Sequence, residues 1–445
     1  MLIRRHGSIL NCVAGMLALL VLLAACGPLA PVTRLASSPT PAPTATPSAT
    51  ATAVPQPTVT SQPTATPASG ELRVWHGFAP DGPEARALAA ALDERPAPLA
   101  ALRVTLVGLP GDELLTRFEV EAAAGGGPDV LIAPNDRVGR QARAGLLLPL
   151  DEALAPVAER YAANALAALE VAGQHYGLPL ARSTVALYAD RARVPQPPAT
   201  TQALLDAARG GLPIVLVRSM YHNYGLIGAF GGRVLDESGR CIADQGGVAE
   251  LLAYLRELRS AGVEFATSGA AAEARFRQRE AALTINGSWL RGDFSAALGA
   301  DLEVAPLPAG PAGPAQPLIG VIGASVNANT RQRQAATQLA LWLTDRAVQQ
   351  ALTDQAQLLP AAALTTPEPT LAGLIAAAET GVARPTRPEF SAFWEPFDAA
   401  LAEVLESDVD PAEAVRQACA AMNQHNGFPP PTPTPEPSSH PTSTP

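Results

Sequence analysis

The chain has 445 residues, of which 47% are hydrophobic and 16% charged, enough for two ordinary domains with a sizeable core. Its formal charge of −10 argues against the basic face that a nucleic-acid-binding protein needs, so no nucleic-acid partner is expected. All 31 basic residues are arginine, which excludes lysine nucleophiles, Schiff bases and the lysine of a phosphate-binding P-loop.

The N-terminus has the pattern of a secretory signal. A basic head, Arg4-Arg5-His6, precedes an apolar run over residues 9–23 that is too short to span a bilayer comfortably. The run ends in Leu23-Ala24-Ala25-Cys26, which resembles the lipobox of bacterial lipoproteins. That resemblance implies a signal peptide at residues 1–25 and an acylated Cys26 that anchors the mature chain to a membrane. The alternative is an ordinary signal peptide followed by an incidental cysteine.

Two stretches rich in proline and threonine flank the rest of the chain, at residues 26–70 and 428–445. Such a composition cannot bury a core, and proline favours extended backbone. We expect a disordered tether between the lipid and the globular part, and a disordered tail. The globular part then covers residues 71–427.

The first half of the globular part alternates strands and helices. Strands are expected at residues 72–78, 102–107 and 129–133, with an apolar helical stripe at 85–92 and a second helix at 114–124. Asp81 is expected to cap the first helix, with Glu84 three residues later. This alternation predicts an α/β fold with a parallel sheet that is covered by helices.

The second half repeats the pattern. Strands are expected at residues 214–217 and 282–285, the latter closed by an Asn286-Gly287 turn. Residues 248–258 form an apolar helical stripe that stops at Gly262, and one long helix is expected at 332–352.

Two cysteines remain in the globular part once Cys12 and Cys26 are assigned to the signal segment and the anchor. Cys241 and Cys419 are expected to be buried free thiols, with a disulfide in an oxidising compartment as the alternative.

Catalytic and metal-binding signatures are missing from the sequence. It contains no HExxH, GxSxG or CxxC motif, and its six histidines are scattered, so no metal or other cofactor is expected. A pair of carboxylates for glycoside hydrolysis has no fixed spacing, so that chemistry stays open.

A series of short segments, in this order, resembles the family 1 extracellular solute-binding proteins of the maltose-binding type. The segments are Gly127-Pro128-Asp129-Val130, Asn135-Asp136-Arg137-Val138-Gly139, Tyr176-Gly177-Leu178-Pro179, Phe230-Gly231-Gly232, residues 282–289, residues 320–324, Leu358-Leu359-Pro360, Ser391-Ala392-Phe393-Trp394 and residues 410–414. Together they span nearly all of residues 71–427.

The resemblance implies a two-lobe periplasmic-binding-protein fold with the ligand in the cleft between the lobes. The N-terminal lobe would comprise residues 71–180 plus 322–360, and the C-terminal lobe 183–318 plus 363–427. The crossings would lie near residues 179–183, 318–322 and 359–362, and closure would be a hinge motion.

The function that the resemblance implies is solute binding without catalysis. A monomeric lipoprotein on the outer side of the cell membrane would deliver a small solute, expected to be an oligosaccharide, to an ABC permease. The alternatives are an extracellular glycoside hydrolase or lyase, and a sensory or adhesive lipoprotein that shares the fold.

Four aromatic residues are candidates for sugar binding, because aromatic faces stack on the C–H side of sugar rings. Trp289 and Trp394 match family positions that stack on sugars, Tyr221 matches another, and Tyr224 lies nearby. The alternative for each is a place in the core, which is the role expected for Trp75 and Trp342.

Polar candidates surround the same segments. Asp136 and Arg137, next to Asn135, match a family pair that hydrogen-bonds sugar hydroxyls, with a loop salt bridge as the alternative. His76 follows the first strand, where the family places a polar ligand contact.

Three positions depart from the maltodextrin-binding pattern. Ala133 stands where that pattern has tryptophan, Arg182 where it has a carboxylate, and Asp398 where it has arginine. With Arg137 and Arg182 both expected to face the cleft, a sugar acid or other anionic solute is the alternative ligand.

Overall fold

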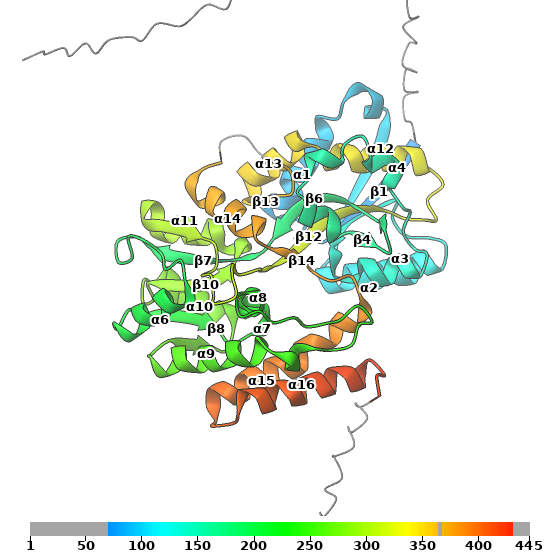
Figure 1. Ribbon diagram of the computed structural model, residues 1–445. Coiled ribbons are helices and arrows are strands. Elements are labelled where there is room, and N and C mark those ends of the chain that lie inside the picture. The colour runs from blue at the N-terminus through cyan, green and yellow to red at the C-terminus, as the bar shows by residue number, and fades with distance from the viewer. Residues whose placement is uncertain (1–69, 364–366, 430–445) are drawn as a thin grey trace, which may run out of the picture. The chain divides into compact units, whose positions relative to one another are not determined.

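A computed structural model describes residues 70–363 and 367–429 of the chain (Figure 1). The predicted signal peptide, the lipidated Cys26 and most of the tether and tail lie outside the described residues. No helix within the described part is both long and apolar enough to cross a membrane.

The larger sheet has seven strands, in the order β13-β6-β12-β3-β1-β2, with β14 paired to the start of β12. The strand β1 is parallel to β2 and β3, as the sequence predicts, whereas β12 runs antiparallel to β3 and β6. The bounds are β1 Gly70–His76, β2 Leu102–Gly108, β3 Val130–Pro134, β6 Leu178–Ser183, β12 Leu318–Val326, β13 Leu359–Pro360 and β14 Val382–Ala383.

The smaller sheet has five strands, in the order β11-β7-β10-β8-β9. It combines antiparallel pairs around β7 with parallel pairs around β8. The bounds are β7 Val185–Asp190, β8 Ile214–Val217, β9 Glu264–Ala266, β10 Leu283–Gly287 and β11 Leu302–Ala305. A separate hairpin pairs β4 Glu170–Val171 with β5 Gln174–His175.

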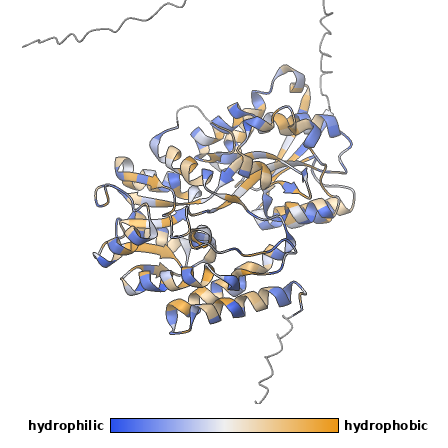
Figure 2. Ribbon diagram, viewed as in Figure 1, coloured by the Kyte–Doolittle hydropathy of each residue, from blue (hydrophilic) through white to orange (hydrophobic). Residues whose placement is uncertain are grey.

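Helices cover both sheets, and in Figure 2 they are banded orange and blue, as expected where one face is buried. The helices of residues 70–180 are α1 Pro83–Asp93, α2 Gly111–Ala123, α3 Val138–Arg143, α4 Asp151–Leu154 and α5 Ala163–Ala167. Those of residues 183–318 are α6 Thr201–Arg209, α7 Met220–Asn223, α8 Gly225–Ala229, α9 Val248–Ser260, α10 Gly269–Arg277 and α11 Arg291–Leu298. The remainder are α12 Arg333–Leu343, α13 Arg346–Ala356, α14 Pro369–Glu379, α15 Trp394–Glu406 and α16 Pro411–His425.

The buried side chains form two hydrophobic clusters that do not divide by sheet. One contains the interior of the larger sheet and continues into one face of the smaller sheet through Tyr188, Phe276 and Phe294. The other fills the opposite face of the smaller sheet, beneath α9, α15 and α16, which lie together in Figure 1.

The two sheets are joined by strands that run from one into the other. The strand β6 leads through Ser183 and Thr184 directly into β7, and β12 enters the larger sheet from the loop after β11. The strands β13, β6 and β12 lie side by side, with Arg182 paired to both Leu359 and Val321. The family resemblance places the three crossings at these strands.

Three local predictions are wrong. The first helix begins one residue later than expected, because Pro83 occupies its first turn and Gly82, not Asp81, is the N-cap residue. Asn286 and Gly287 form no turn but the last residues of β10, which a 3₁₀ turn at Ser288–Leu290 follows. The long helix is two, because the Asp345 carboxylate caps a new helix by accepting from the backbone N–H of Ala347 at 3.1 Å.

The favoured assignment of free thiols is also wrong. Cys241 and Cys419 form a disulfide, with their Cα atoms 5.5 Å apart. The backbone N–H of Cys241 also donates to Oδ1 of Asn423 at 2.8 Å. Asn423 lies one helical turn after Cys419 in α16, so this bond holds the loop that contains Cys241 against α16. The two cysteines are 178 residues apart in sequence, so only the fold could show that they meet.

Candidate functional site

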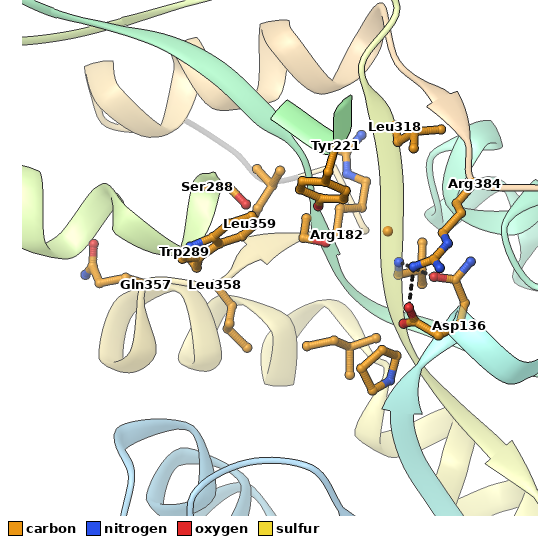
Figure 3. A pocket seen from close by; sticks show the side chains of 16 residues that line it. Asp136, Arg182, Tyr221, Ser288, Trp289, Leu318, Gln357, Leu358, Leu359 and Arg384 are labelled. Carbon is orange, nitrogen blue, oxygen red and sulfur yellow. Dashed lines mark hydrogen bonds and ion pairs between the residues drawn. The ribbon is translucent and has the colours of Figure 1, made fainter. Parts of the chain in front are cut away.

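A pocket of about 420 Å³ lies where the crossing strands meet the smaller sheet, and we call it the central pocket (Figure 3). Residues from both sheets and from the crossing strands line it. They are Pro134, Asn135, Asp136, Arg182, Ser183, Tyr221, Ser288, Trp289, Leu318, Gly320, Val321, Ile322, Gln357, Leu358, Leu359 and Arg384. A concave, mainly apolar pocket of this size with a few polar groups is typical of small-molecule sites.

Trp289 presents an apolar face to this pocket. The residue is 52% exposed, although it is a large hydrophobic side chain. It follows β10 in the 3₁₀ turn at Ser288–Leu290, and its ring lies over Gly287. A Cβ atom at position 287 would fall 2.1 Å from Trp289 Cζ2, so glycine there permits this position of the ring.

Two more of the predicted aromatic residues lie beside Trp289. The ring of Tyr221 lies 6.1 Å from that of Trp289 and 6.0 Å from that of Trp394. The Tyr221 hydroxyl lies next to Ser183, and burial raises the pKa of Tyr221 to about 12, so the phenol is neutral at physiological pH. The fold therefore brings three predicted aromatics together: Trp289 and Tyr221 line the central pocket, and Trp394 packs against Tyr221 without being part of the lining.

Asp136 and Arg137 point to different neighbours. The Asp136 carboxylate forms an ion pair with Arg384 at one edge of the central pocket, drawn as a dashed line in Figure 3. Arg137 turns toward α2, where it donates to Thr116 Oγ1 at 2.9 Å and lies 3.7 Å from the carboxylate of Glu119. The expected pair is therefore split, and Arg137 does not line the central pocket.

Asn135 and Arg182 line the central pocket but have structural partners. Asn135 donates to the carbonyl of Ala168 at 3.0 Å and accepts from the N–H of Val321 at 3.0 Å. The bond from Val321 holds β12, and the bond to Ala168 ties Asn135 to the residue after α5.

Arg182 joins two crossing strands. It is 5% exposed, and its Nε donates to the carbonyl of Pro360 at 2.9 Å while its Nη1 meets Glu379 at 3.3 Å. Burial lowers the pKa of Arg182, and the Glu379 carboxylate opposes that shift. The guanidinium charge is therefore partly balanced by a partner that the sequence does not reveal.

Two predicted residues lie away from the central pocket. His76 is 3% exposed at the end of β1, beside Phe78, and burial lowers its pKa. Tyr224 packs edge-on against Phe390 and Phe393, with ring centroids 5.8 and 5.6 Å away, and burial raises its pKa. Trp75 is buried, and Trp342 packs against the same cluster, as expected.

The sequence also missed Arg384, which lines the central pocket, and His222, which packs against two aromatic residues of its lining. Arg384 meets Asp136 across 248 residues, and its guanidinium lies 5.5 Å from the Trp394 ring. His222 lies beside Tyr221 and Trp289, and burial lowers its pKa to about 4. No local motif marks either residue, because their positions depend on long-range packing.

Asp398, which stands where the maltodextrin-binding pattern has arginine, has a structural role. Its carboxylate accepts from the backbone N–H of Met220 at 2.6 Å, at the start of α7, and burial raises its pKa.

Two arginines, Arg182 and Arg384, and one carboxylate line the central pocket. Asp136 is the one carboxylate among its lining residues, and it is paired with Arg384. Among residues 70–363 and 367–429, no three His, Cys, Asp or Glu side chains come together as a metal site.

Comparison with known proteins agrees with this architecture. Residues 99–373 match the family model described as bacterial extracellular solute-binding protein. The chain is 27% identical over 370 residues to the maltotriose-binding protein of Pyrococcus abyssi, covering 78% of this chain and 79% of that protein. It is 26% identical over 345 residues to the galactooligosaccharide-binding protein of Bacillus subtilis, covering 71% and 81% respectively.

Solved structures show the same two-lobe fold. A cyclo/maltodextrin-binding protein in complex with maltotetraose superposes with a TM-score of 0.71 at 27% identity, covering 80% of this chain and 97% of that chain. The maltotriose-binding protein of Thermus thermophilus, bound with maltotriose, gives a TM-score of 0.64 at 25% identity, covering 80% and 100% respectively.

Proposed function

The chain belongs to the bacterial extracellular solute-binding proteins, and on that premise we propose that it binds an oligosaccharide in the central pocket and delivers it to an ABC-type permease. The observation that carries the proposal is the half-exposed Trp289 ring, backed by Tyr221 and Trp394, over a pocket with few polar groups. Aromatic faces of this kind stack on sugar rings, and the polar side chains nearby can accept and donate to hydroxyls.

The relatives support an oligosaccharide in particular. The two curated relatives are named for maltotriose and galactooligosaccharides, and the solved structures hold maltotetraose and maltotriose. In this chain Ser183, Ser288 and Gln357 would supply neutral hydrogen-bonding groups to sugar hydroxyls, as residues that line the central pocket.

Binding without turnover is part of the proposal. Glycoside hydrolysis needs two carboxyl groups on either side of the scissile bond. Asp136 is the only carboxylate among the residues that line the central pocket, and it is paired with Arg384. A bound oligosaccharide should therefore be recovered unchanged after long incubation with the protein.

We also propose the cellular setting that the sequence predicts. Cleavage after Ala25 would leave Cys26 as a lipidated N-terminus, and the monomeric binding unit would work outside the cytoplasm at the end of its tether. Residues 71–180 plus 322–360 and residues 183–318 plus 363–427 would act as two lobes that hinge at the crossing strands. Mass spectrometry of the membrane-extracted protein tests the lipid, and size-exclusion chromatography with light scattering tests the monomer.

Isothermal titration calorimetry of the chain without residues 1–25, with Cys26→Ser to avoid lipidation, tests the ligand class. Gluco- and galactooligosaccharides of two to four units are the panel, and Trp289→Ala is the matched variant. A ligand at 100 times its Kd should also stabilise the fold by about 2.7 kcal/mol. Saturable binding that Trp289→Ala weakens supports the proposal. Absence of binding to every oligosaccharide, with a folded protein, refutes it.

A further inference from the structure

A second pocket, of about 670 Å³, adjoins the central pocket, and we call it the arginine pocket. It lies between the start of α2, the helix α3 and the segment at residues 384–391. Pro134, Asp136 and Arg384 line both pockets, so the Asp136–Arg384 ion pair stands at their boundary. A ligand that extends past this ion pair would occupy both pockets.

Five arginines and two aspartates line the arginine pocket, namely Arg137, Arg140, Arg143, Arg384, Arg387, Asp112 and Asp136. Three of the arginines have carboxylate partners: Arg137 and Arg140 share Glu119, and Arg384 pairs with Asp136. Within the described part of the chain, Arg143 and Arg387 have no carboxylate within 4.0 Å, although Asp112 also lines the pocket. The pocket therefore keeps an excess of positive charge in a protein whose net charge is −10.

The two arginines without carboxylate partners are held in place by backbone carbonyls. Arg143 Nη2 donates to the carbonyl of Thr386 at 3.3 Å. Arg387 donates from Nη1 to the carbonyl of Asp236 at 2.9 Å and from Nη2 to that of Glu237 at 2.5 Å. These bonds use only part of each guanidinium, which has five N–H donors. The remaining donors are free to meet an anion without a large loss of side-chain entropy.

The segment that carries Thr386 and Arg387 is itself fixed against α3. A Cβ atom on Gly139 would fall 1.9 Å from the Thr386 carbonyl oxygen, so this close approach requires glycine. Thr386 Oγ1 also donates to the carbonyl of Glu170 at 3.0 Å. The apolar side chains of Leu115 and Phe390 complete the wall, while Arg140, Arg143 and Arg387 remain exposed to solvent.

We propose that the arginine pocket binds an anionic substituent on the sugar that the central pocket holds, so that the transported solute is an acidic oligosaccharide. This inference rests on the proposed oligosaccharide function. Guanidinium groups suit the paired oxygens of a carboxylate, and they also bind sulfate or phosphate esters. The shared chemistry is an anion that is covalently attached to a carbohydrate.

Calorimetry with four probes tests the inference: a neutral trisaccharide, the same trisaccharide ending in a uronic acid, its phosphate ester, and inorganic phosphate. We expect the acidic ligands to bind at least tenfold tighter than the neutral one at low salt. The preference should shrink at high salt, because exposed charges are screened. The uronic acid and ester arms distinguish carboxylate from phosphate as the substituent.

Arg143→Gln and Arg387→Gln should each reduce the affinity for the acidic ligand about tenfold, as expected for one lost charge-assisted hydrogen bond. Affinity for the neutral trisaccharide should stay within about twofold under the same change. The matched control is Arg259→Gln on the outer side of α9, which changes the net charge equally and should leave the preference intact.

Equal affinity for neutral and acidic trisaccharides, or variants that leave the preference unchanged, overturns the arginine pocket inference while oligosaccharide binding stands. Tight binding of inorganic phosphate with no gain from the attached sugar also overturns it, since the anion would then be bound independently. If no carbohydrate binds and the protein is folded, the proposed function itself fails.

Discussion

Gly287→Ala tests whether ligand binding depends on where the Trp289 ring lies, because the variant keeps the tryptophan but displaces its ring. The backbone of Gly287 has φ −77° and ψ 152°, which alanine adopts without strain, so the strand should tolerate the change. The new Cβ atom would lie 2.1 Å from Trp289 Cζ2, and the half-exposed ring must therefore move off the pocket wall.

The expected loss follows from the exposed area of the ring. A tryptophan offers roughly 200 Å² of surface, of which about half remains open for a ligand, or about 100 Å². At about 25 cal/mol per Å², covering it contributes about 2.5 kcal/mol, which corresponds to roughly 60-fold in Kd. Gly287→Ala should cause most of that loss of affinity, while the free energy of unfolding changes by less than about 1 kcal/mol.

Calorimetry on Gly287→Ala, Trp289→Ala and the double variant gives the assay. The two losses should not add, because both remove the same stacking surface. Gly126→Ala is the control, since its Cβ atom would meet nothing closer than 3.5 Å. Wild-type affinity in Gly287→Ala, or additive losses in the double variant, would refute the role of the ring.

Three further perturbations test other parts of the structure. Gly139→Ala should displace the segment around Thr386 and lower the midpoint of thermal unfolding; an unchanged midpoint would contradict the close packing seen there. Reduction of the Cys241–Cys419 disulfide should lower the free energy of unfolding by about 2–4 kcal/mol, measured by urea titration with and without reductant, and identical curves would argue against the bond. Burial lowers the pKa of His222 to about 4, below its unfolded value, so its neutral ring favours the folded state above pH 6.5 and this contribution is lost as the pH falls from 6.5 to 4. His222→Gln should therefore flatten the fall in stability between pH 7 and pH 4.5, and a parallel fall in both proteins would exclude the histidine as its source.

The sequence was informative where local patterns decide structure. The period of apolar residues predicted α9 and the strands β2 and β8 to within two residues, because one buried face constrains such segments. The interruption between α12 and α13 at Thr344 was missed although Asp345 offers a good N-cap, because the apolar stripe continues from one helix into the next.

Only part of the candidate site was predicted, namely the residues that lie in segments with a local pattern. Trp289 and Tyr221 fall in segments with a recognisable pattern, and the fold brings them together at the central pocket. The partners of charged residues could not be foreseen: Arg137 turns to Glu119, and Asp136 meets Arg384. Ion pairs between residues far apart in sequence depend on tertiary packing, which no local spacing encodes.

The hydrophobic cluster that runs from the larger sheet into the smaller one has a consequence for how the protein melts. Since Tyr188, Phe276 and Phe294 belong to the same buried network as β1 and β12, neither sheet can lose its interior without exposing part of the other's. Heating should therefore give one cooperative transition with equal calorimetric and van't Hoff enthalpies, not two independent steps. A ligand held at the crossing strands would then raise a single melting temperature for the whole described body.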